Sequence, residues 1–470
     1  MNDQPKGSRL DRFLRLFSDV RAGEGAQALL LAMNVFIILT AYYLMKPSRD
    51  ALVLAEGSAE LKSYLSAGVA VLLVPLVQLY GRLADKVPRM RLISLVTYGF
   101  VALLVVFYLL AQLNVPLSIP FFLYVSIFNL MVIAQFWSFA NDIYTTEEGE
   151  RLFPIIVFGM SLGAVLGAAI ATLLIGPLGH YGLMLVAGGL MLLSLLITKH
   201  VDRKQRHRTE SHLPPAQTTA EMPAATGQFR LETGEFKALT EEQARESGSG
   251  EGAFALVFKT RYLLLIALMV LLTNWVNTLG GYILDVTVKE AAQVAVAAGQ
   301  AGGLDEGEYI ARFLGGFFTG VNLLGVLAQM FIVSRMIKYV GVKGSLLALP
   351  IIALLGNGAI VVAPVLAVVR IAKTAENATD YSLQNTLKNA LWLPTTREQK
   401  YKAKQAIDAF FARLGDLLQA AVVFVGTTYL ALNVGGFAVV NVVLAVIWIA
   451  VVVAIGREYV HLTKTGQPPV

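Results

Sequence analysis

Residues 46–50 read Lys-Pro-Ser-Arg-Asp and place three charges at the end of a long apolar run. Inserting one ion into lipid costs about 3 kcal/mol or more, so charges at membrane depth mostly face one another or a water-filled cavity. Ammonium and guanidinium groups bind anionic oxygens through charge-assisted hydrogen bonds. Lys46, Arg49 and Asp50 are therefore candidate contacts for a charged solute.

A second polar set recurs every three or four positions between residues 370 and 388, which places its members on one face of a helix. The set comprises Arg370, Lys373, Asn377, Asp380 or Tyr381, Gln384 and Lys388. Such a face cannot meet lipid. It predicts either a stripe that lines a solute path or internal ion pairs, for example of Lys373 with Glu376 or Asp380. Both interpretations can hold together, because pairs that gate a cavity are also ion pairs.

Other charged or polar residues lie near the ends of further apolar runs. Asn141 and Asp142 follow the aromatic sequence Phe-Trp-Ser-Phe-Ala, and an ordinary interfacial tryptophan with a helix-end acid is the alternative to a solute contact. Asp408, Arg413 and Asp416 fall in a later run. For these three, structural pairing between helices is as good an explanation as a functional role.

Enzyme signatures are thin in this sequence. It holds no Gly-rich phosphate loop ending in Lys-Ser/Thr, and its five histidines show no metal-ligand spacing. The absence of cysteine excludes disulfides, thiolate catalysis and Cys-ligated metals. An ATP-driven pump needs a soluble nucleotide-binding domain, for which there is no room. We therefore expect no enzymatic activity, no metal and no cofactor, and an energy supply from a gradient or from exchange.

The composition of the chain indicates whether the helices that position these residues lie in water or in a membrane. The 470 residues are 56% apolar and 15% charged, against roughly 25% charged in soluble domains, and the mean hydropathy is +0.64. Such a chain needs a bilayer. The net charge of +6 is small for this length, and Lys and Arg lie in loops, so we expect no binding of nucleic acid.

Twelve apolar runs reach the roughly 20 residues needed to cross a bilayer core. They are residues 26–47, 62–82, 91–112, 119–143, 153–175, 180–199, 261–285, 313–334, 344–363, 364–392, 407–431 and 434–456. The tenth and eleventh carry several charges, so we expect them to be packed inside and shielded from lipid. The first run is too long for a signal-peptide core, and we expect it to be retained.

Basic residues predict the orientation. With the N-terminus in the cytoplasm, Lys and Arg gather on the cytoplasmic side in the N-terminal tail, in loops 82–91, 199–208, 335–343 and 397–404, and in the C-terminal tail. The opposite loops 113–118 and 432–433 have none, as the positive-inside rule requires. Loop 144–152 is the exception, because its three glutamates outnumber Arg151. Both termini are therefore expected in the cytoplasm.

Residues 200–252 are polar and lack apolar periodicity, which predicts a flexible cytoplasmic linker. This linker divides the chain into an N-terminal six-helix bundle, residues 1–199, and a C-terminal six-helix bundle, residues 253–470. Two equal halves indicate parallel repeats with a solute held between them near midplane. The predicted fold is an all-α membrane protein with twelve transmembrane helices in two bundles related by pseudo-twofold symmetry.

Two local motifs support this fold. Residues 81–91 resemble the loop signature of the major facilitator superfamily, G-x-L-a-D-(R/K)-x-G-R-(R/K), with Pro88 where that pattern has Gly. Gly159, Gly163 and Gly167 recur at every fourth position, a spacing that lets two membrane helices approach closely. The second motif predicts helix packing.

The charged positions together resemble the ATP/ADP translocases of plastids and intracellular bacteria, a nucleotide-transporter family with a facilitator-like fold. Residues 46–50 match its K-P-x-R-D, and residues 136–142 resemble its F-W-x-x-A-N-E. Asp285 falls where the family has Glu in E-V-T-x-K. Residues 400–408 match K-x-K-G-K-x-A-I-D, with Ala403 in place of Gly.

The resemblance implies that the family's transport-critical charges correspond to Lys46, Asp142, Asp285 and Lys404. Both acids are shortened from Glu to Asp, and Asp416 stands where the family usually has Lys. The family's F-D-x-T-K-E run reads Gln-Asn-Thr-Leu-Lys-Asn at residues 384–389. These departures indicate a divergent branch.

We expect a secondary transporter that moves nucleotides by alternating access, as ATP/ADP-type exchange or as uptake, and that acts as a monomer among the lipids of a bacterial inner membrane. The candidate substrate-binding residues are Lys46, Arg49, Asp50, Asn141, Asp142, Asp285, Arg370, Lys373, Asp380, Gln384, Lys388 and Lys404. Of these, the cations expected to face phosphate are Lys46, Arg49, Lys373, Lys388 and Lys404.

Two alternatives remain. The first is a proton-coupled transporter of another organic anion, in which Asp142 or Asp285 carries the proton. The second is a membrane scaffold or sensor that transports nothing, which the charged interior stripe disfavours.

Overall fold

The computed structural model describes residues 20–21, 24–144, 146–211, 253–396, 399, 403–465 and 469. These residues are almost entirely helical and contain no strand. Eight of their helices are long and apolar enough to cross a membrane. The protein is a multi-pass membrane protein, and the predicted all-α class is confirmed.

Each predicted apolar run falls on helix. The first half of the chain forms α2 (Gly25–Glu56), α3 (Ala59–Lys86), α4 (Arg89–Gln112), α5 (Ser118–Ile143) and α6 (Thr146–Ser211). The second half forms α8 (Ala253–Lys259), α9 (Arg261–Ala297), α10 (Glu306–Ala328), η1 (Gln329–Val333), α11 (Ser334–Ser345), α12 (Ala348–Val362), α13 (Leu366–Thr379), η2 (Asp380–Gln384), α14 (Asn385–Ala390), α15 (Lys404–Ala406), η4 (Ile407–Phe411), α16 (Ala412–Thr428) and α17 (Val434–Thr465). The elements η1, η2 and η4 are single π-helical segments.

Helix α6 covers both the fifth and the sixth predicted run, because the chain bends at Gly179. This residue has φ 63° and ψ −179°, a backbone conformation that glycine adopts without a steric penalty. The helix then continues to Ser211, beyond residue 199, where the first bundle was predicted to end. The rest of the predicted linker, residues 212–252, lies outside the described residues.

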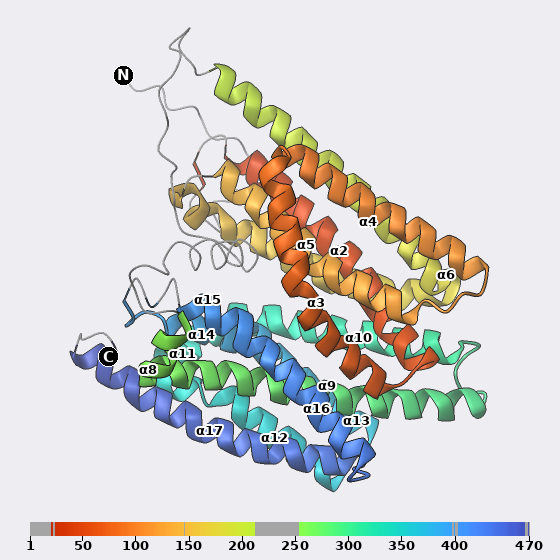
Figure 1. Ribbon diagram of the computed structural model, residues 1–470, viewed down its shortest axis with the longest axis vertical. Helices are drawn as coiled ribbons and strands as arrows, with labels where there is room; N and C mark the ends of the chain where they lie inside the picture. The colour runs from red at the N-terminus through yellow and green to blue at the C-terminus, as the bar shows by residue number, and fades with distance from the viewer. Residues whose placement is uncertain are drawn as a thin grey trace.

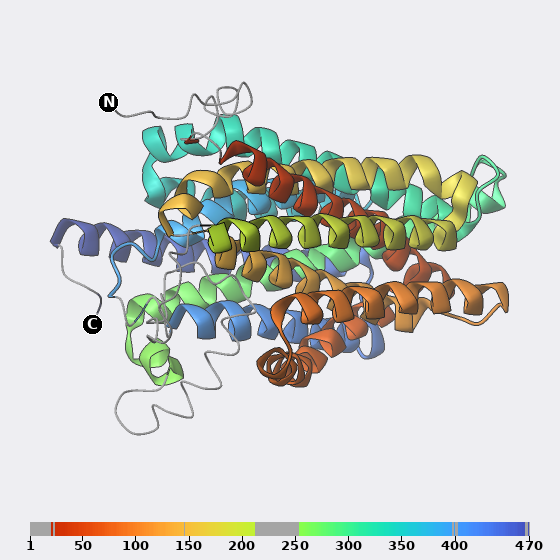
Figure 2. The same cartoon turned by 90° about the horizontal axis from the view of Figure 1, so that it is seen from above.

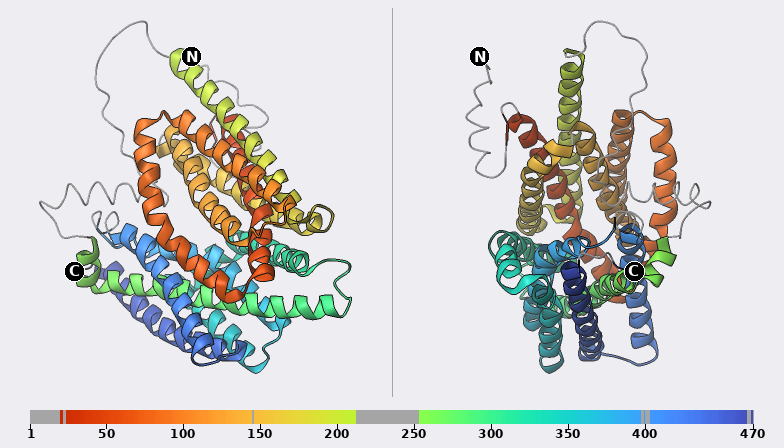
Figure 3. Two further views of the ribbon diagram at one scale, coloured as in Figure 1. Left: turned by 45° about the vertical axis from the view of Figure 1, so that its right-hand side comes forward. Right: turned by 90° about the vertical axis from the view of Figure 1, so that its left-hand side faces the viewer.

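Helices α2–α6 and helices α8–α17 form two groups, which lie above and below one another in Figure 1 and which Figure 3 shows from two further sides. Helix α10 of the second group packs on α2 and α6 of the first. Figure 2 shows most helices running along one common direction. We call the face where α2 begins and α17 ends the terminal face, and the face where α2 ends and α3 begins the far face. The two groups meet toward the far face, where α3 lies against α9 and α16.

Helix α2 packs closely on α6 along the predicted glycine row. A Cβ atom on Gly159 would lie 2.5 Å from the carbonyl oxygen of Ala32, and one on Gly167 would lie 2.8 Å from the Cα of Thr40. No side chain fits at these positions. The prediction that this row serves helix packing is confirmed, and the packing fixes α2, which carries residues 46–50.

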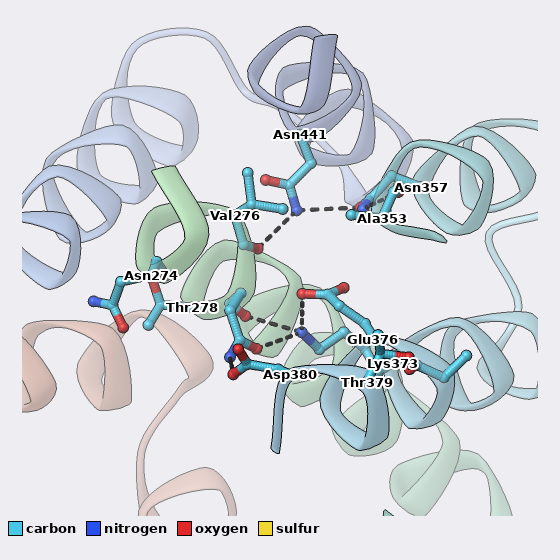
Figure 4. Close-up of polar contacts among 12 residues, drawn as sticks. Asn274, Val276, Thr278, Ala353, Asn357, Lys373, Glu376, Thr379, Asp380 and Asn441 are labelled. Atoms are coloured by element: carbon cyan, nitrogen blue, oxygen red, sulfur yellow. Dashed lines mark hydrogen bonds and ion pairs between the residues drawn. The ribbon is translucent and has the colours of Figure 1, made fainter. Parts of the chain in front are cut away.

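A buried asparagine bridge fixes α9 within the second group. The side chain of Asn441 on α17 donates hydrogen bonds to the carbonyl oxygen of Val276 (3.2 Å) and to Oδ1 of Asn357 on α12 (3.2 Å). Figure 4 shows this bridge above the charged residues of α13. It secures α9 at the turn that also lines the cavity described below.

Replacing Gly167 with alanine should destabilise the protein, because the added methyl group overlaps the backbone of Thr40. Overpacking of this kind costs about 1–3 kcal/mol, so the melting temperature in detergent should fall by several degrees. Gly189→Ala on the same helix is the matched control, because its methyl group would meet no atom within 4 Å. Equal melting of Gly167→Ala and wild type would show that close approach of α2 and α6 is not required.

Candidate solute-binding site

Lys46 projects from α2 into a cage of three aromatic rings. Its Nζ lies 3.9 Å from the ring centre of Phe318 on α10, 5.2 Å from that of Tyr43 and 5.9 Å from that of Tyr42. Aromatic faces attract a cation without neutralising it. Within the described part of the chain Lys46 forms no ion pair and no hydrogen bond. Its ammonium group is therefore available to an anion.

The next charged residues form a closed network that joins the two groups of helices. Arg49 pairs with Asp50 (Nη2–Oδ1 2.6 Å), and Lys62 on α3 pairs with Asp50 (3.4 Å) and with Asp285 on α9 (2.7 Å). Both acids are buried, at 3% and 6% exposure. We call Arg49, Asp50, Lys62 and Asp285 the inter-group network. Its positive and negative charges balance, which low-dielectric burial requires.

The sequence-based prediction missed Lys62, which has the shortest ion-pair contact between the two groups. Lys62 is the fourth residue of α3 and opens the second apolar run, so in the sequence it looks like an ordinary charge at a helix end. The available signal was the adjacent polar cluster of Glu60, Lys62 and Ser63 at the start of that run.

Three more contacts close the far face around the inter-group network. Tyr282 donates a hydrogen bond to Glu60 (2.7 Å), Gln419 donates one to Ser63 (3.0 Å), and Lys289 donates one to the carbonyl oxygen of Gly57. Each of them joins α9 or α16 to the region between the end of α2 and the start of α3. The far face is therefore closed in this structure.

A cavity of about 390 Å³ lies in the second group. Its polar lining comes from α9, η2 and α14 and comprises Thr273, Asn274, Asn277, Asp380, Tyr381, Gln384, Asn385 and Lys388. Tyr381 packs beside Gly325 on α10, and Asn322 on the neighbouring turn of α10 accepts a hydrogen bond from Tyr43 of the cage around Lys46 (3.3 Å). The structure thus places Asp380, Gln384 and Lys388 on one cavity that adjoins the cage.

The cations of the polar helix face between residues 370 and 388 already have partners. Lys373 is buried and pairs with Glu376 (2.9 Å), as Figure 4 shows, and it also donates to Oδ1 of Asn277 (2.8 Å). Lys388 pairs with Asp408 (3.0 Å). Of the two partners predicted for Lys373, the structure selects Glu376. Arg370 is exposed and stacks on the ring of Phe313, at 5.2 Å.

Asp142 lies at the terminal face, where Arg89 bridges it (2.9 Å) to Asp202 on α6 (2.8 Å). At the same face Arg151 forms hydrogen bonds with both carboxylate oxygens of Glu24, and these bonds hold the pKa of Glu24 below its usual range. The structure therefore does not bring Asp142 next to Lys46. Asp142 joins helices within the first group in this state.

The remaining candidates also lie toward the terminal face. Asn141 precedes Asp142 in the last turn of α5. Lys404 begins α15 and donates a hydrogen bond to Asn389 on α14 (3.2 Å). The four charges that the resemblance marks as critical are thus divided, with Lys46 and Asp285 toward the far face and Asp142 and Lys404 at the terminal face.

Residues 159–163 read Gly-Met-Ser-Leu-Gly, the pattern of a hydrolase nucleophile turn, which must sit between a strand and a helix. Here the five residues lie inside α6, and Ser161 donates its hydroxyl to the carbonyl oxygen of Val157 (3.1 Å). Ser161 is therefore a helix residue without a catalytic setting.

Solved structures with a similar arrangement of helices show which fold this chain has. A bacterial homologue of the iron transporter ferroportin in an inward-facing state has a TM-score of 0.62 at 11% identity, covering 92% of this chain and 98% of that chain. The nucleoside transporter NupG has a TM-score of 0.58 at 12% identity, with 93% and 98% covered. This chain therefore shares the fold of these two solved transporters.

Sequence comparison narrows the class. Residues 343–459 match the family model described as TLC ATP/ADP transporter. The chain is also 23% identical to ADP,ATP carrier protein 2 of Chlamydia pneumoniae, over 91% of this chain and 88% of that protein. The chain is thus similar to this family over residues 343–459 and to an ADP,ATP carrier over most of its length, which confirms the resemblance inferred from its motifs.

Replacing Lys62 with methionine should weaken closure of the far face, because Asp50 and Asp285 would lose the cation between them. Breaking a buried pair by removing one partner costs about 3–5 kcal/mol. Because the chain has no cysteine, spin labels on Ile119→Cys and Val296→Cys can report the distance across this face by electron paramagnetic resonance. We expect a longer-distance population in Lys62→Met. Lys62→Arg, which keeps the charge, is the control, and identical distances in all three proteins would contradict the gating role.

Proposed function

We propose that the protein is a secondary transporter that moves nucleotides across the membrane by alternating access. The observation that carries this proposal is Lys46, an interior ammonium group held by aromatic rings and left without an acid partner among the described residues. A polyphosphate supplies the missing negative charge. The relative from Chlamydia pneumoniae, an ADP,ATP carrier, is named for that chemical class.

The geometry suggests how binding could drive the cycle. Lys46 and Asp50 are four residues apart on α2 and so lie on neighbouring turns of one face. A phosphate on Lys46 competes with Asp50 for Arg49 and adds negative charge beside the inter-group network. Asp50, which has lost Arg49, then attracts Lys62 more strongly, the bond of Lys62 to Asp285 weakens, and the far face opens to release or exchange the solute.

The proposal also covers the movement of the two bundles, the orientation in the membrane and the oligomeric state. The two predicted six-helix bundles, residues 1–199 and 253–470, rock against one another about the Lys46 cage. The positive-inside rule places the terminal face, and with it both termini, in the cytoplasm, and the membrane is a bacterial inner membrane. We propose a monomer that works as a carrier, with no enzymatic step.

Replacing Lys46 with glutamine should reduce exchange of labelled ATP against internal ADP in liposomes by at least about tenfold, because the loss of one charge-assisted contact to phosphate is of that size. Lys199→Gln is the matched control, since Lys199 also lies over a tyrosine ring, at 5.2 Å from Tyr98, but on the exposed surface. Exchange at the wild-type rate in Lys46→Gln would remove α2 from the solute path and refute the proposal.

The proton-coupled alternative makes a different prediction in the same liposomes. Accumulation that follows an imposed pH gradient and ignores internal nucleotide would favour it over exchange. In that case Asp285→Asn should abolish the response to the gradient, because the amide cannot take up a proton. Exchange that is indifferent to the gradient in wild type and in Asp285→Asn would exclude that alternative.

A further inference from the structure

One carboxylate in the cavity is out of place for an anion transporter. Asp380 lines the cavity of about 390 Å³ and forms no ion pair with any described residue. The charged groups that act electrostatically on it are Glu376, Lys373 and Lys388. Lys373 is already paired with Glu376, and Lys388 with Asp408. Asp380 therefore presents an uncompensated acceptor to the cavity.

A polar relay holds this carboxylate in position. Lys373 donates to Oδ1 of Asn277 (2.8 Å), which turns the amide nitrogen of Asn277 toward Oδ2 of Asp380 (3.4 Å). In Figure 4, Asp380 lies beside Lys373 and Glu376. Asp380 also opens the π-helical segment η2, and single π-helical turns inside α-helices are frequent at functional sites. The relay gives Lys373 a positioning role in place of phosphate binding.

The cavity and the cage around Lys46 therefore suit different parts of one solute. An ionised Asp380 in the cavity repels phosphate, whereas Lys46 in the cage attracts it. Tyr381, the residue after Asp380, packs beside Gly325 on α10, the helix that also supplies Phe318 to the cage around Lys46. The part of the solute that meets Asp380 must donate hydrogen bonds and must be attached close to the phosphates.

We propose that Asp380 binds the ribose hydroxyl groups of the transported nucleotide, its two carboxylate oxygens accepting hydrogen bonds from the vicinal 2′- and 3′-hydroxyls. This inference rests on the proposed nucleotide transport and extends it to the sugar. In dinucleotide-binding folds, a carboxylate likewise accepts a hydrogen bond from a ribose hydroxyl. Ribose is directly bonded to the phosphate chain, which distinguishes it from the more distant edge of the base. Asp380 thus selects ribonucleotides over deoxyribonucleotides.

The test measures affinities of the purified full-length protein in detergent for ATP, 2′-deoxy-ATP and 3′-deoxy-ATP by titration calorimetry. In wild type, each deoxy analogue should bind about tenfold more weakly than ATP, as expected for one lost hydrogen bond to a charged acceptor. In Asp380→Ala and Asp380→Asn the preference should shrink to within about twofold. Asp202→Asn is the control, because it removes a buried acid that pairs with Arg89 at the terminal face of the first group, away from the cavity, and it should keep the wild-type preference.

The outcomes separate the two proposals. Equal binding of ATP and both deoxy analogues by the wild-type protein would overturn the ribose contact. This measurement needs no variant, so the proposal can be refuted even if the Asp380 variants do not fold. A preference that persists in Asp380→Asn would overturn it as well. A pH dependence of exchange that is lost in Asp380→Asn while the sugar preference stays would assign a proton to Asp380 and likewise refute the contact. No binding of any nucleotide by wild type would instead refute the proposed function.

Discussion

Pairing of buried charge is the constraint on which the rest of this structure depends. Ions removed from water are tolerated when partners satisfy them, and the interior charges of α2, α3, α9 and α13 mostly follow that rule. Asp50 and Asp285 share Lys62, and Glu376 neutralises Lys373. Because these pairs are complete, the two interior charges that have no partner of opposite sign are candidates for binding a solute. Among the residues that the structure describes, Lys46 is a cation without an acid, and Asp380 is an acid without a cation.

The location of each pair decides whether it stabilises one group of helices or couples both. The Lys373–Glu376 pair lies within α13, so it persists however the groups move. The Lys62–Asp285 pair joins α3 to α9 and must break whenever the far face opens. Both ions then enter water, where they are well solvated, which keeps the free-energy cost of opening modest. A hydrophobic contact of equal area would oppose opening more strongly, since its exposure to water is not compensated.

Much of the fold could be predicted from the sequence, because run length and hydropathy act locally and each predicted apolar run became helix. The Lys373–Glu376 pair was also within reach, since its spacing of three residues is a helical neighbour relation. Lys62 was not, because its partners lie on other helices and no local pattern specifies a partner across 223 residues. The family motifs name Asp142 and Lys46 together, but in this structure the two residues lie far apart. A motif marks a residue as important and does not specify its depth in the membrane. The predicted roles of these residues in substrate binding stay predictions.

The two exceptions together explain how one site could favour a nucleotide over simpler anions. A small inorganic anion can satisfy Lys46 but leaves Asp380 without a hydrogen-bond donor, and a neutral nucleoside does the reverse. A molecule that joins phosphate to a vicinal diol satisfies both ends at once, and each contact contributes to binding only when the other end is also filled correctly. Selectivity then follows from the separation of Lys46 in its aromatic cage from Asp380 in the cavity. The polar relay of Lys373 and Asn277 preserves that separation by holding the carboxylate of Asp380 away from the neighbouring cations.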